Sequence, residues 1–494
     1  MAKPQSGLDS REKLHQYMAM RRMRSNVRHS WILAVKKFWR CGWALCFLGV
    51  AENGISAQTT NVVVHPEKVL VKNFEGWGTS LCWWANVCGG YTNRETYAEL
   101  AFRSLKLNIV RYNIGGGENP NIPNTLAFRA RVPGFEPADG VWDWNADANQ
   151  RWMLKRAVAL GADRVVAFAN SPPWWMTESR SVTGTADGSS NNLRAECELA
   201  FCQYLATVVS NLTVLDGVRF DYVTPLNEPS ANWWKLGHWQ EGCHVSAGQQ
   251  ARLVNTLRTA LDRQSLATRI IANEDNDERS AVSALESFGQ AERHVALIAT
   301  HTYHANDPSG IRNLAKRWSK PAWVSEYGDG DASGLTLARR IRDDITEARV
   351  SAWIYWQVVD NAGGWGFLRN PLSDEGDSMP ALNKKYFVMG QFSRFIRPGA
   401  EIIAVDDANS LAAYDPIRHS LTIVALNDED KSLKLCFDLS QFAGWPTQVS
   451  GVQTSAQQNW SVCLPNRLAD QYYSVELQPR SVSSFSFKPI DPSK

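Results

Sequence analysis

The stretch "FDYVTPLNEP", residues 220–229, decides the fold because its pattern returns along the chain. It begins as a short apolar run and ends in an asparagine and a glutamate. The segments between such runs repeat apolar residues every three or four positions, which is the helical period. Eight runs that alternate with helices predict an α/β fold, a (β/α)8 TIM barrel. The other seven runs are 75–81, 107–115, 164–173, 269–276, 296–304, 322–328 and 350–357.

A doubly wound open sheet is the alternative α/β arrangement. The count of eight favours the barrel, and so do the polar residues at the end of every run. Barrel enzymes carry their active sites at the carboxyl ends of the strands, so these polar ends predict one shared site.

Both ends of the chain differ from this central region, 75–397. Residues 398–494 alternate apolar and polar positions between turn residues, which predicts an antiparallel β-module. Residues 58–74 contain the β-like stretch "NVVVHPEKVLVK" and are a candidate to join that module. Residues 1–57 combine a long basic region, the short apolar run "CGWALCFLGVA" and small residues near Ala57. That order predicts a signal peptide, and the apolar run is too short to span a membrane.

Charge and cysteine content limit the classes of partner. The first 57 residues carry ten basic and three acidic residues in a chain of net charge +2, so the remainder carries about −5. We therefore expect no nucleic-acid partner. The signal pattern predicts a secreted, periplasmic or cell-surface protein without membrane association after signal removal. We also expect a monomer. Seven cysteines follow residue 57, and export would permit disulfides among them. Their odd number leaves at least one thiol free.

Tryptophan is unusually frequent, with 21 residues in 494. Flat aromatic faces suit sugar-binding clefts, although many of these rings will simply fill the core. The stretch after the opening run, "SANWWKLGHWQEGC", places three tryptophans behind Glu228.

Two carboxylates stand at the ends of runs that face each other across a barrel mouth. Glu228 ends the fourth run, and Glu326 in "WVSEYG" ends the seventh. Hydrolysis of a glycosidic bond uses such a pair, one to protonate the leaving oxygen and one to stabilise or attack the anomeric carbon. Structural ion pairs at strand ends are the alternative interpretation. His301 and His304 show no convincing ligand pattern and no CxxC pair is present, so we expect no metal and no cofactor.

Several stretches together resemble glycoside hydrolase family 30, in the TIM-barrel clan of retaining glycosidases. They span residues 76–399 and are "GWGTSLCWWA", "LNIVRYNIGGG", "ANSPPWWM", "LNEP", "WVSEYG" and "YFVMGQFSRFIRPG". The resemblance implies that Glu228 is the acid/base and Glu326 the nucleophile. It also implies a β-sandwich side domain built from 58–74 and 398–494. "SLCWWA" and "NWWKLGHWQEGC" look most like the endo-β-1,6-galactanases.

The neighbouring residues supply candidate roles in substrate binding. Asn227 is expected to bind the sugar 2-hydroxyl, and Arg111 to keep Glu326 ionised or to form a plain salt bridge. Tyr303 is expected to donate to the nucleophile and Trp356 to form the floor under the reacting sugar. The predicted substrate-binding residues are Arg111, Asn113, Trp174, Asn227, Trp233, Trp234, Tyr303 and Trp356.

The expected activity is that of a secreted retaining endo-glycosidase on β-1,6-linked galactan, as in arabinogalactan side chains. Three enzymatic alternatives stay open: a β-1,6-glucanase, a xylanase and an exo-acting β-glycosidase of the same family. A carbohydrate-binding barrel without catalysis is the alternative from another class, and the presence of both carboxylates argues against it.

Overall fold

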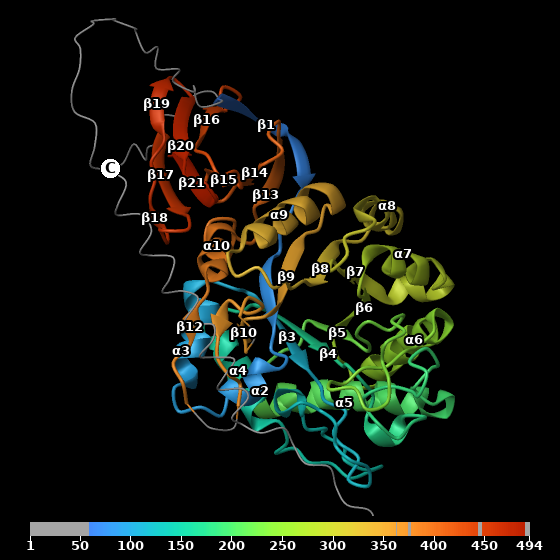
Figure 1. Cartoon of the computed structure of the whole chain (residues 1–494). Helices are drawn as coiled ribbons and strands as arrows, with labels where there is room; N and C mark the ends of the chain where they lie inside the picture. Colours follow the sequence, from blue (N-terminus) through green and yellow to red (C-terminus); the bar gives the residue numbers. More distant parts are fainter. Residues whose placement is uncertain (1–58, 362, 374–376, 443–446, 490–494) are drawn as a thin grey trace, which may run out of the picture. The chain divides into compact units, whose positions relative to one another are not determined.

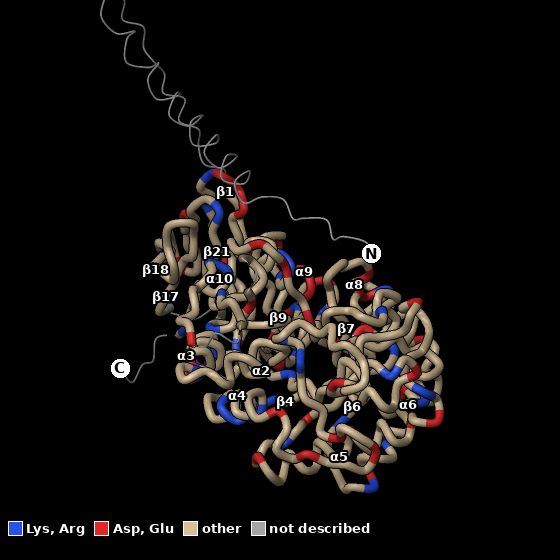
Figure 2. Tube along the Cα trace, turned by 60° about the horizontal axis from the view of Figure 1, so that its bottom comes forward, with Lys and Arg blue, Asp and Glu red and all other residues tan. Residues whose placement is uncertain are grey.

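The computed structural model describes residues 59–361, 363–373, 377–442 and 447–489. The predicted signal peptide, residues 1–57, lies outside the described residues. Basic and acidic residues are interspersed along the described chain (Figure 2). All seven cysteines in the described part are free thiols.

Eight parallel strands close into a barrel, and each neighbouring pair is hydrogen-bonded. Strand β2 pairs with β9 to complete the ring, with Gly76 opposite Ala352. All eight predicted runs supply a strand, so the prediction of a TIM barrel is confirmed and the open-sheet alternative is wrong. The strands are β2 (Gly76–Ser80), β3 (Ile109–Asn113), β4 (Arg164–Phe168), β5 (Tyr222–Thr224), β6 (Arg269–Asp275), β7 (Val295–His301), β8 (Ala322–Glu326) and β9 (Ala352–Gln357).

The barrel interior is packed with side chains from alternate strand positions, as expected for this fold. Val166, Ile271 and Trp323 belong to this inner cluster. The longer helices lie around the outside of the strands (Figure 1). They are α4 (Ala148–Ala159), α5 (Glu198–Asp216), α6 (Ala247–Arg263), α7 (Glu278–Glu286), α8 (Pro308–Trp318), α9 (Leu335–Asp343) and α10 (Lys384–Ser393).

Shorter helical segments complete the loops and helix ends around the strands. They are α2 (Trp84–Cys88), α3 (Arg94–Ala98), η1 (Glu99–Ser104), η2 (Phe128–Ala130), η3 (Trp174–Met176), η4 (Ala195–Cys197), η5 (Gly289–His294) and η6 (Asp344–Ala348).

Helix α5 shows why the sequence forms these elements. Its apolar residues recur at helical spacing, and among them Phe201, Leu205 and Val209 are buried. It stops at Gly217, whose φ of +67° suits a residue without a Cβ. Residues 195–216 are long and apolar enough to span a membrane by length and composition. Their buried face packs into the core around the barrel, which accounts for that composition.

A second sheet of ten strands contains both ends of the described chain (Figure 1). Strand β1 (Thr59–Val71) lies between two C-terminal strands, antiparallel to β13 and parallel to β16. Val62, Phe437 and Phe485 share its separate core. The other strands are β13 (Glu401–Val405), β14 (Ser410–Asp415), β15 (Ser420–Asn427), β16 (Leu433–Asp438), β17 (Thr447–Thr454), β18 (Ser461–Val462), β19 (Asn466–Ala469), β20 (Tyr472–Leu477) and β21 (Ser481–Pro489).

Helix α10 joins the barrel to this sheet. The indole Nε1 of Trp460 donates to the carbonyl of Phe387, and Ser484 donates to Gln391. A small three-stranded sheet near the barrel mouth consists of β10 (Val359–Asp360), β11 (Leu368–Arg369) and β12 (Ala381–Leu382).

Candidate active site

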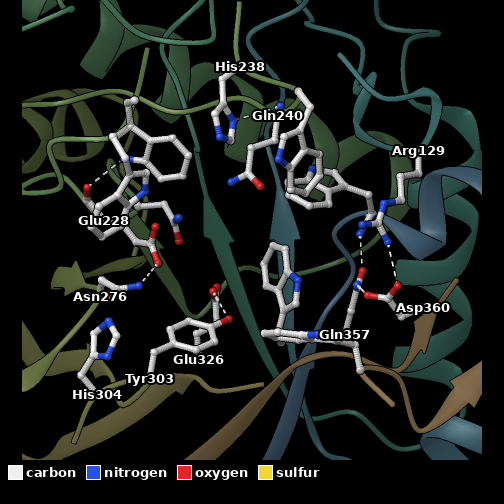
Figure 3. A pocket seen from close by; sticks show the side chains of 17 residues that line it. Arg129, Glu228, His238, Gln240, Asn276, Tyr303, His304, Glu326, Gln357 and Asp360 are labelled. Carbon is white, nitrogen blue, oxygen red and sulfur yellow. Dashed lines mark hydrogen bonds and ion pairs between the residues drawn. The ribbon is translucent and has the colours of Figure 1, made fainter. Parts of the chain in front are cut away.

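A cleft of about 610 Å³ opens at the carboxyl ends of the barrel strands. Glu326 is the last residue of β8, and Glu228 is the fourth residue after β5. Both carboxylates line the cleft (Figure 3). Its lining comprises Trp83, Arg129, Asn227, Glu228, Trp233, Trp234, His238, Trp239, Gln240, Asn276, Tyr303, His304, Glu326, Trp356, Gln357, Asp360 and Trp365.

The turn that carries Glu228 is held in an unusual backbone conformation. Glu228 has a φ of +48°, a region that residues with a Cβ rarely adopt. Its N–H donates to the carbonyl of Glu274, and its own carbonyl accepts from the indole of Trp234. Such conformations persist where the surroundings over-determine them, commonly at functional sites.

Glu228, Glu326 and His301 converge at the centre of the cleft. One ligand atom from each lies within 4.8 Å of the other two. Nδ1 of His301 lies 3.2 Å from Oε1 of Glu228 and 3.6 Å from Oε1 of Glu326. The imidazole therefore contacts both carboxylates at once.

Arg111, fully buried in the middle of β3, links this centre to a third carboxylate. Its Nη1 donates to Glu326 at 2.8 Å and its Nη2 to Glu274 at 3.0 Å. Burial raises the pKa of Glu326 above its ordinary value, while His301 and Arg111 oppose that rise. The predicted contact between Arg111 and Glu326 is present. It lowers the pKa of Glu326, but the rise caused by burial is larger.

His301 is the positive partner of Glu228 and Glu326. Burial alone would lower its pKa, but Glu326, Glu228 and Glu274 together raise it to about 10. The ring is therefore protonated at neutral pH. The three converging residues are close enough to hold a cation, which would have to displace the proton that the carboxylates favour on His301.

Three predicted binding residues surround this pair. The phenol of Tyr303 donates to Oε1 of Glu326 at 2.9 Å. Oδ1 of Asn227 accepts from Arg111 at 3.3 Å, so its amide nitrogen is the donor it can present to a sugar hydroxyl. Trp356 lines the cleft at the end of β9, with Trp83 edge-on to its ring at 5.0 Å.

Three predicted binding residues do not line the cleft: Asn113, Trp174 and Arg111, which is fully buried behind Glu326. The side chain of Asn113 is buried and donates to Glu241, while it accepts from Asn170. Trp174 lies in η3 and donates its indole N–H to the carbonyl of Pro137. Asn113 is the last residue of β3 and Trp174 follows β4, but residues of neighbouring loops take up their polar groups.

The substrate-binding residues predicted from the sequence omit the buried His301 and several residues that line the cleft. His301 and Asn276 stand at polar ends of runs, which is the signal that could have identified them. The sequence pattern raises only a metal-ligand role for His301 and does not support that role. Arg129 and Asp360 gave no comparable signal, because they lie in the short elements η2 and β10, which no sequence pattern connects.

Comparison with known proteins agrees with this geometry. The model of O-glycosyl hydrolase family 30 matches residues 67–312. An endo-β-1,6-galactanase of Hypocrea rufa is 34% identical over 420 residues, which cover 76% of this chain and 85% of that protein. The chain belongs to glycoside hydrolase family 30. It is therefore a glycoside hydrolase with a carbohydrate substrate, and the predicted family is confirmed.

Other relatives within family 30 are more distant. An exo-β-1,6-galactobiohydrolase of Bifidobacterium longum is 24% identical, over 80% of this chain and 36% of its own length. The catalytic domain of GH30 xylanase C from Talaromyces cellulolyticus aligns with 87% of this chain and all of that domain, with a TM-score of 0.69 and 24% identity. The latter likeness shows the shared fold.

The adjacent tryptophans of the loop after β5 should behave differently when removed. Both rings line the cleft, but Trp233 is 40% exposed, whereas Trp234 is 1% exposed and donates its indole N–H to the carbonyl of Glu228. We expect Trp233→Ala to lower kcat/KM about tenfold on long oligosaccharides, because one stacking face of about 1 kcal/mol or more is lost. Trp234→Ala should instead destabilise the fold by about 3–5 kcal/mol.

Melting temperature and chain-length dependence, measured on both variants, check this prediction. Trp233→Ala should melt near the wild-type temperature and lose little on a short aryl glycoside. A large drop in melting temperature with no dependence on chain length would show that the Trp233 ring only packs.

The same loop is anchored by a buried acid, Glu241. Its Oε1 accepts from the N–H of Gly116 at 2.8 Å, and burial raises its pKa to about 8. The folded state thus holds a proton that the unfolded chain releases near pH 4.5. The free energy of unfolding must therefore fall as pH rises from about 4.5 to about 8.

We expect Glu241→Gln, which cannot ionise, to reduce this fall by roughly 2–4 kcal/mol. Asp147 and Asp344, each raised by burial to a pKa of about 7, act in the same direction and will leave a residual slope. Urea unfolding of both proteins at pH 5 and pH 8 measures the difference. Equal losses in the variant and the wild type would contradict the assignment of a proton to Glu241.

Proposed function

We propose that this family 30 protein is an exported, retaining endo-β-1,6-galactanase. The observation that carries the retaining mechanism is the short separation of the carboxylates, whose oxygens approach within 4.8 Å. Retaining glycosidases hold their carboxyl groups about 5 Å apart, and inverting enzymes hold them further apart to admit a water. Export rests on the basic and apolar pattern of residues 1–57.

In the first step, Glu326 attacks the anomeric carbon and Glu228 gives its proton to the leaving oxygen. The glycosidic bond breaks and a covalent glycosyl-enzyme forms. In the second step, Glu228 takes a proton from water, and the resulting oxygen nucleophile displaces Glu326 from the anomeric carbon. The sugar leaves with its original configuration, because the carbon has been inverted twice.

His301 fits this sequence of charges. Negative charge resides on Glu326 before the first step and on Glu228 after it. The protonated imidazole lies within 3.6 Å of both carboxylates, so it remains paired with the charged one throughout. Tyr303 and Arg111 hold Glu326 in position for the attack.

The substrate assignment is supported by the relative from Hypocrea rufa, named for β-1,6-galactan cleavage and 34% identical to this chain. The aromatic lining of the cleft is consistent with binding a chain rather than a single sugar. Trp83, Trp233 and Trp239 line the same cleft as Trp356 and the two carboxylates.

Digestion of β-1,6-galactan, β-1,6-glucan and xylan by the purified mature protein tests this function. We expect oligosaccharides of several lengths from the galactan at early times, with little product from the other two. Release of a single short product would indicate exo action. Preferential cleavage of glucan or xylan would overturn the galactan assignment.

A further inference from the structure

A buried polar cluster occupies the side of the cleft away from Glu228. Arg129, Gln357 and Asp360, here called the Arg–Gln–Asp cluster, lie across Glu326 from Glu228 (Figure 3). They come from η2, from the last position of β9 and from β10. None of them has a role in the two chemical steps described above.

The cluster is built rigidly. Asp360 is 4% exposed, and its Oδ1 accepts from Nη1 of Arg129 at 3.0 Å. Its other oxygen, Oδ2, accepts from Nε2 of Gln357. Oε1 of Gln357 in turn accepts from the backbone N–H of Trp83 at 3.3 Å. Each side chain is therefore held in one orientation before a substrate arrives.

Aromatic rings connect the cluster to the floor of the cleft. The Arg129 guanidinium lies 5.5 Å from the ring centre of Trp239 and 5.9 Å from that of Trp83. Trp83 also meets Trp356 edge-on. A sugar that lies on Trp356 therefore has the Arg–Gln–Asp cluster beside it.

Ligand binding accounts for this cluster better than stability does. Removing a charge pair from water costs several kcal/mol per ion, and an apolar pair often serves a fold as well or better. The cluster lines the substrate cleft, and its guanidinium and carboxylate together offer donors and an acceptor. A sugar hydroxyl both donates and accepts, so the pair matches its hydrogen-bonding needs.

The geometry of a pyranose indicates which hydroxyl is concerned. Its C4 lies across the ring from C1, and C1 must sit between Glu228 and Glu326 for reaction. The hydroxyl on C4 then points to the side of the cleft away from the leaving group, where the cluster stands. In a 1,6-linked chain this hydroxyl stays unsubstituted in the backbone linkage, and it is axial in galactose but equatorial in glucose.

We propose that the Arg–Gln–Asp cluster binds the axial 4-hydroxyl of the reacting sugar, which makes Arg129 and Asp360 specificity-determining residues for galactose over glucose. The proposal rests on the proposed function and deepens it by naming the groups that select the sugar.

The test uses three aryl β-1,6-disaccharides with galactose as the outer sugar. The sugar attached to the aryl group is galactose, 4-deoxygalactose or glucose, and kcat/KM is measured for each. We expect the wild type to lose about 10- to 100-fold when the 4-hydroxyl is absent or equatorial, the value of a hydrogen bond to a charged group. Asp360→Asn should lose a similar factor in kcat/KM on the galactose substrate alone. The ratio of kcat/KM for the galactose substrate to that for the 4-deoxygalactose substrate should then be near one.

His304→Ala is the matched control, because His304 lines the opposite side of the cleft beside Asn276. It should lower kcat/KM on all three substrates by the same factor and keep the wild-type ratio. Arg129→Lys keeps the charge but not the forked geometry, and it repeats the test if Asp360→Asn melts at a much lower temperature than the wild type.

An unchanged ratio in folded Asp360→Asn and Arg129→Lys would overturn the proposal while the galactanase function stands. A wild-type ratio of kcat/KM near one between the galactose and 4-deoxygalactose substrates would also overturn the proposal. Failure on polymeric galactan, together with a strong galactose preference on the aryl substrates, would overturn the proposed endo-galactanase function and leave the cluster's role intact.

Discussion

Glu326→Ala should lower kcat on β-1,6-galactan by about five orders of magnitude, because the residue is the proposed nucleophile and residual catalysis comes only from binding and the acid. The fold should persist, because Glu326 is at a strand end and Arg111 keeps a second carboxylate partner, Glu274. The pKa of His301 should also fall, because Glu326 contributes more than the other carboxylates to raising it. Steady-state kinetics and a melting curve measure both the activity and the fold.

Azide provides the diagnostic rescue for this variant. The small anion fits the space of the lost carboxylate and attacks the anomeric carbon, so activity on an activated aryl substrate should return with a glycosyl azide of inverted configuration. Glu476→Ala removes an exposed glutamate in β20 and should retain full activity as a control. Near-normal turnover by Glu326→Ala would show that another group is the nucleophile.

Glu228→Ala should show a loss that depends on the leaving group. A general acid contributes about 10²- to 10⁴-fold, and most of this is needed when the leaving alcohol is a sugar hydroxyl. An aryl group with a low pKa departs without protonation, so cleavage of such a substrate should be impaired much less in the first step. Plotting kcat/KM against leaving-group pKa for the variant and the wild type measures this difference.

The azide product separates the two variants. In Glu228→Ala the glycosyl-enzyme still forms on Glu326, so azide should release it as a glycosyl azide of retained configuration. Equal losses on sugar and aryl leaving groups, with no effect of azide, would contradict an acid role for Glu228.

The barrel and the proposed catalytic pair could be predicted from the sequence because both depend on local order. Each strand is a short apolar run that ends in polar residues, and Glu228 and Glu326 stand at two such ends. Closure of the barrel then brings these ends together without further information. Arg111 and Tyr303 were found by the same reasoning, and both contact Glu326.

The remaining features depend on loop packing, which no local pattern encodes. Trp233 and Trp234 are adjacent and chemically identical, yet only the former is exposed in the cleft. Asn113 looks like a binding residue until Glu241, 128 positions away, accepts its hydrogen bond. The contact between Arg129 in η2 and Asp360 in β10 likewise joins residues that are 231 positions apart. Long-range pairs of this kind emerge only from the three-dimensional structure.

The configuration of the first product is the most direct test of the central proposal, a retaining endo-β-1,6-galactanase. Proton NMR spectra recorded in the first minutes of a β-1,6-galactan digest, before the sugars mutarotate, show which anomer is released. The account predicts that new reducing ends of oligosaccharides appear as the β-anomer and that the α-anomer grows in later. Initial release of the α-anomer would contradict the covalent intermediate on Glu326, and the absence of new reducing ends would contradict the substrate.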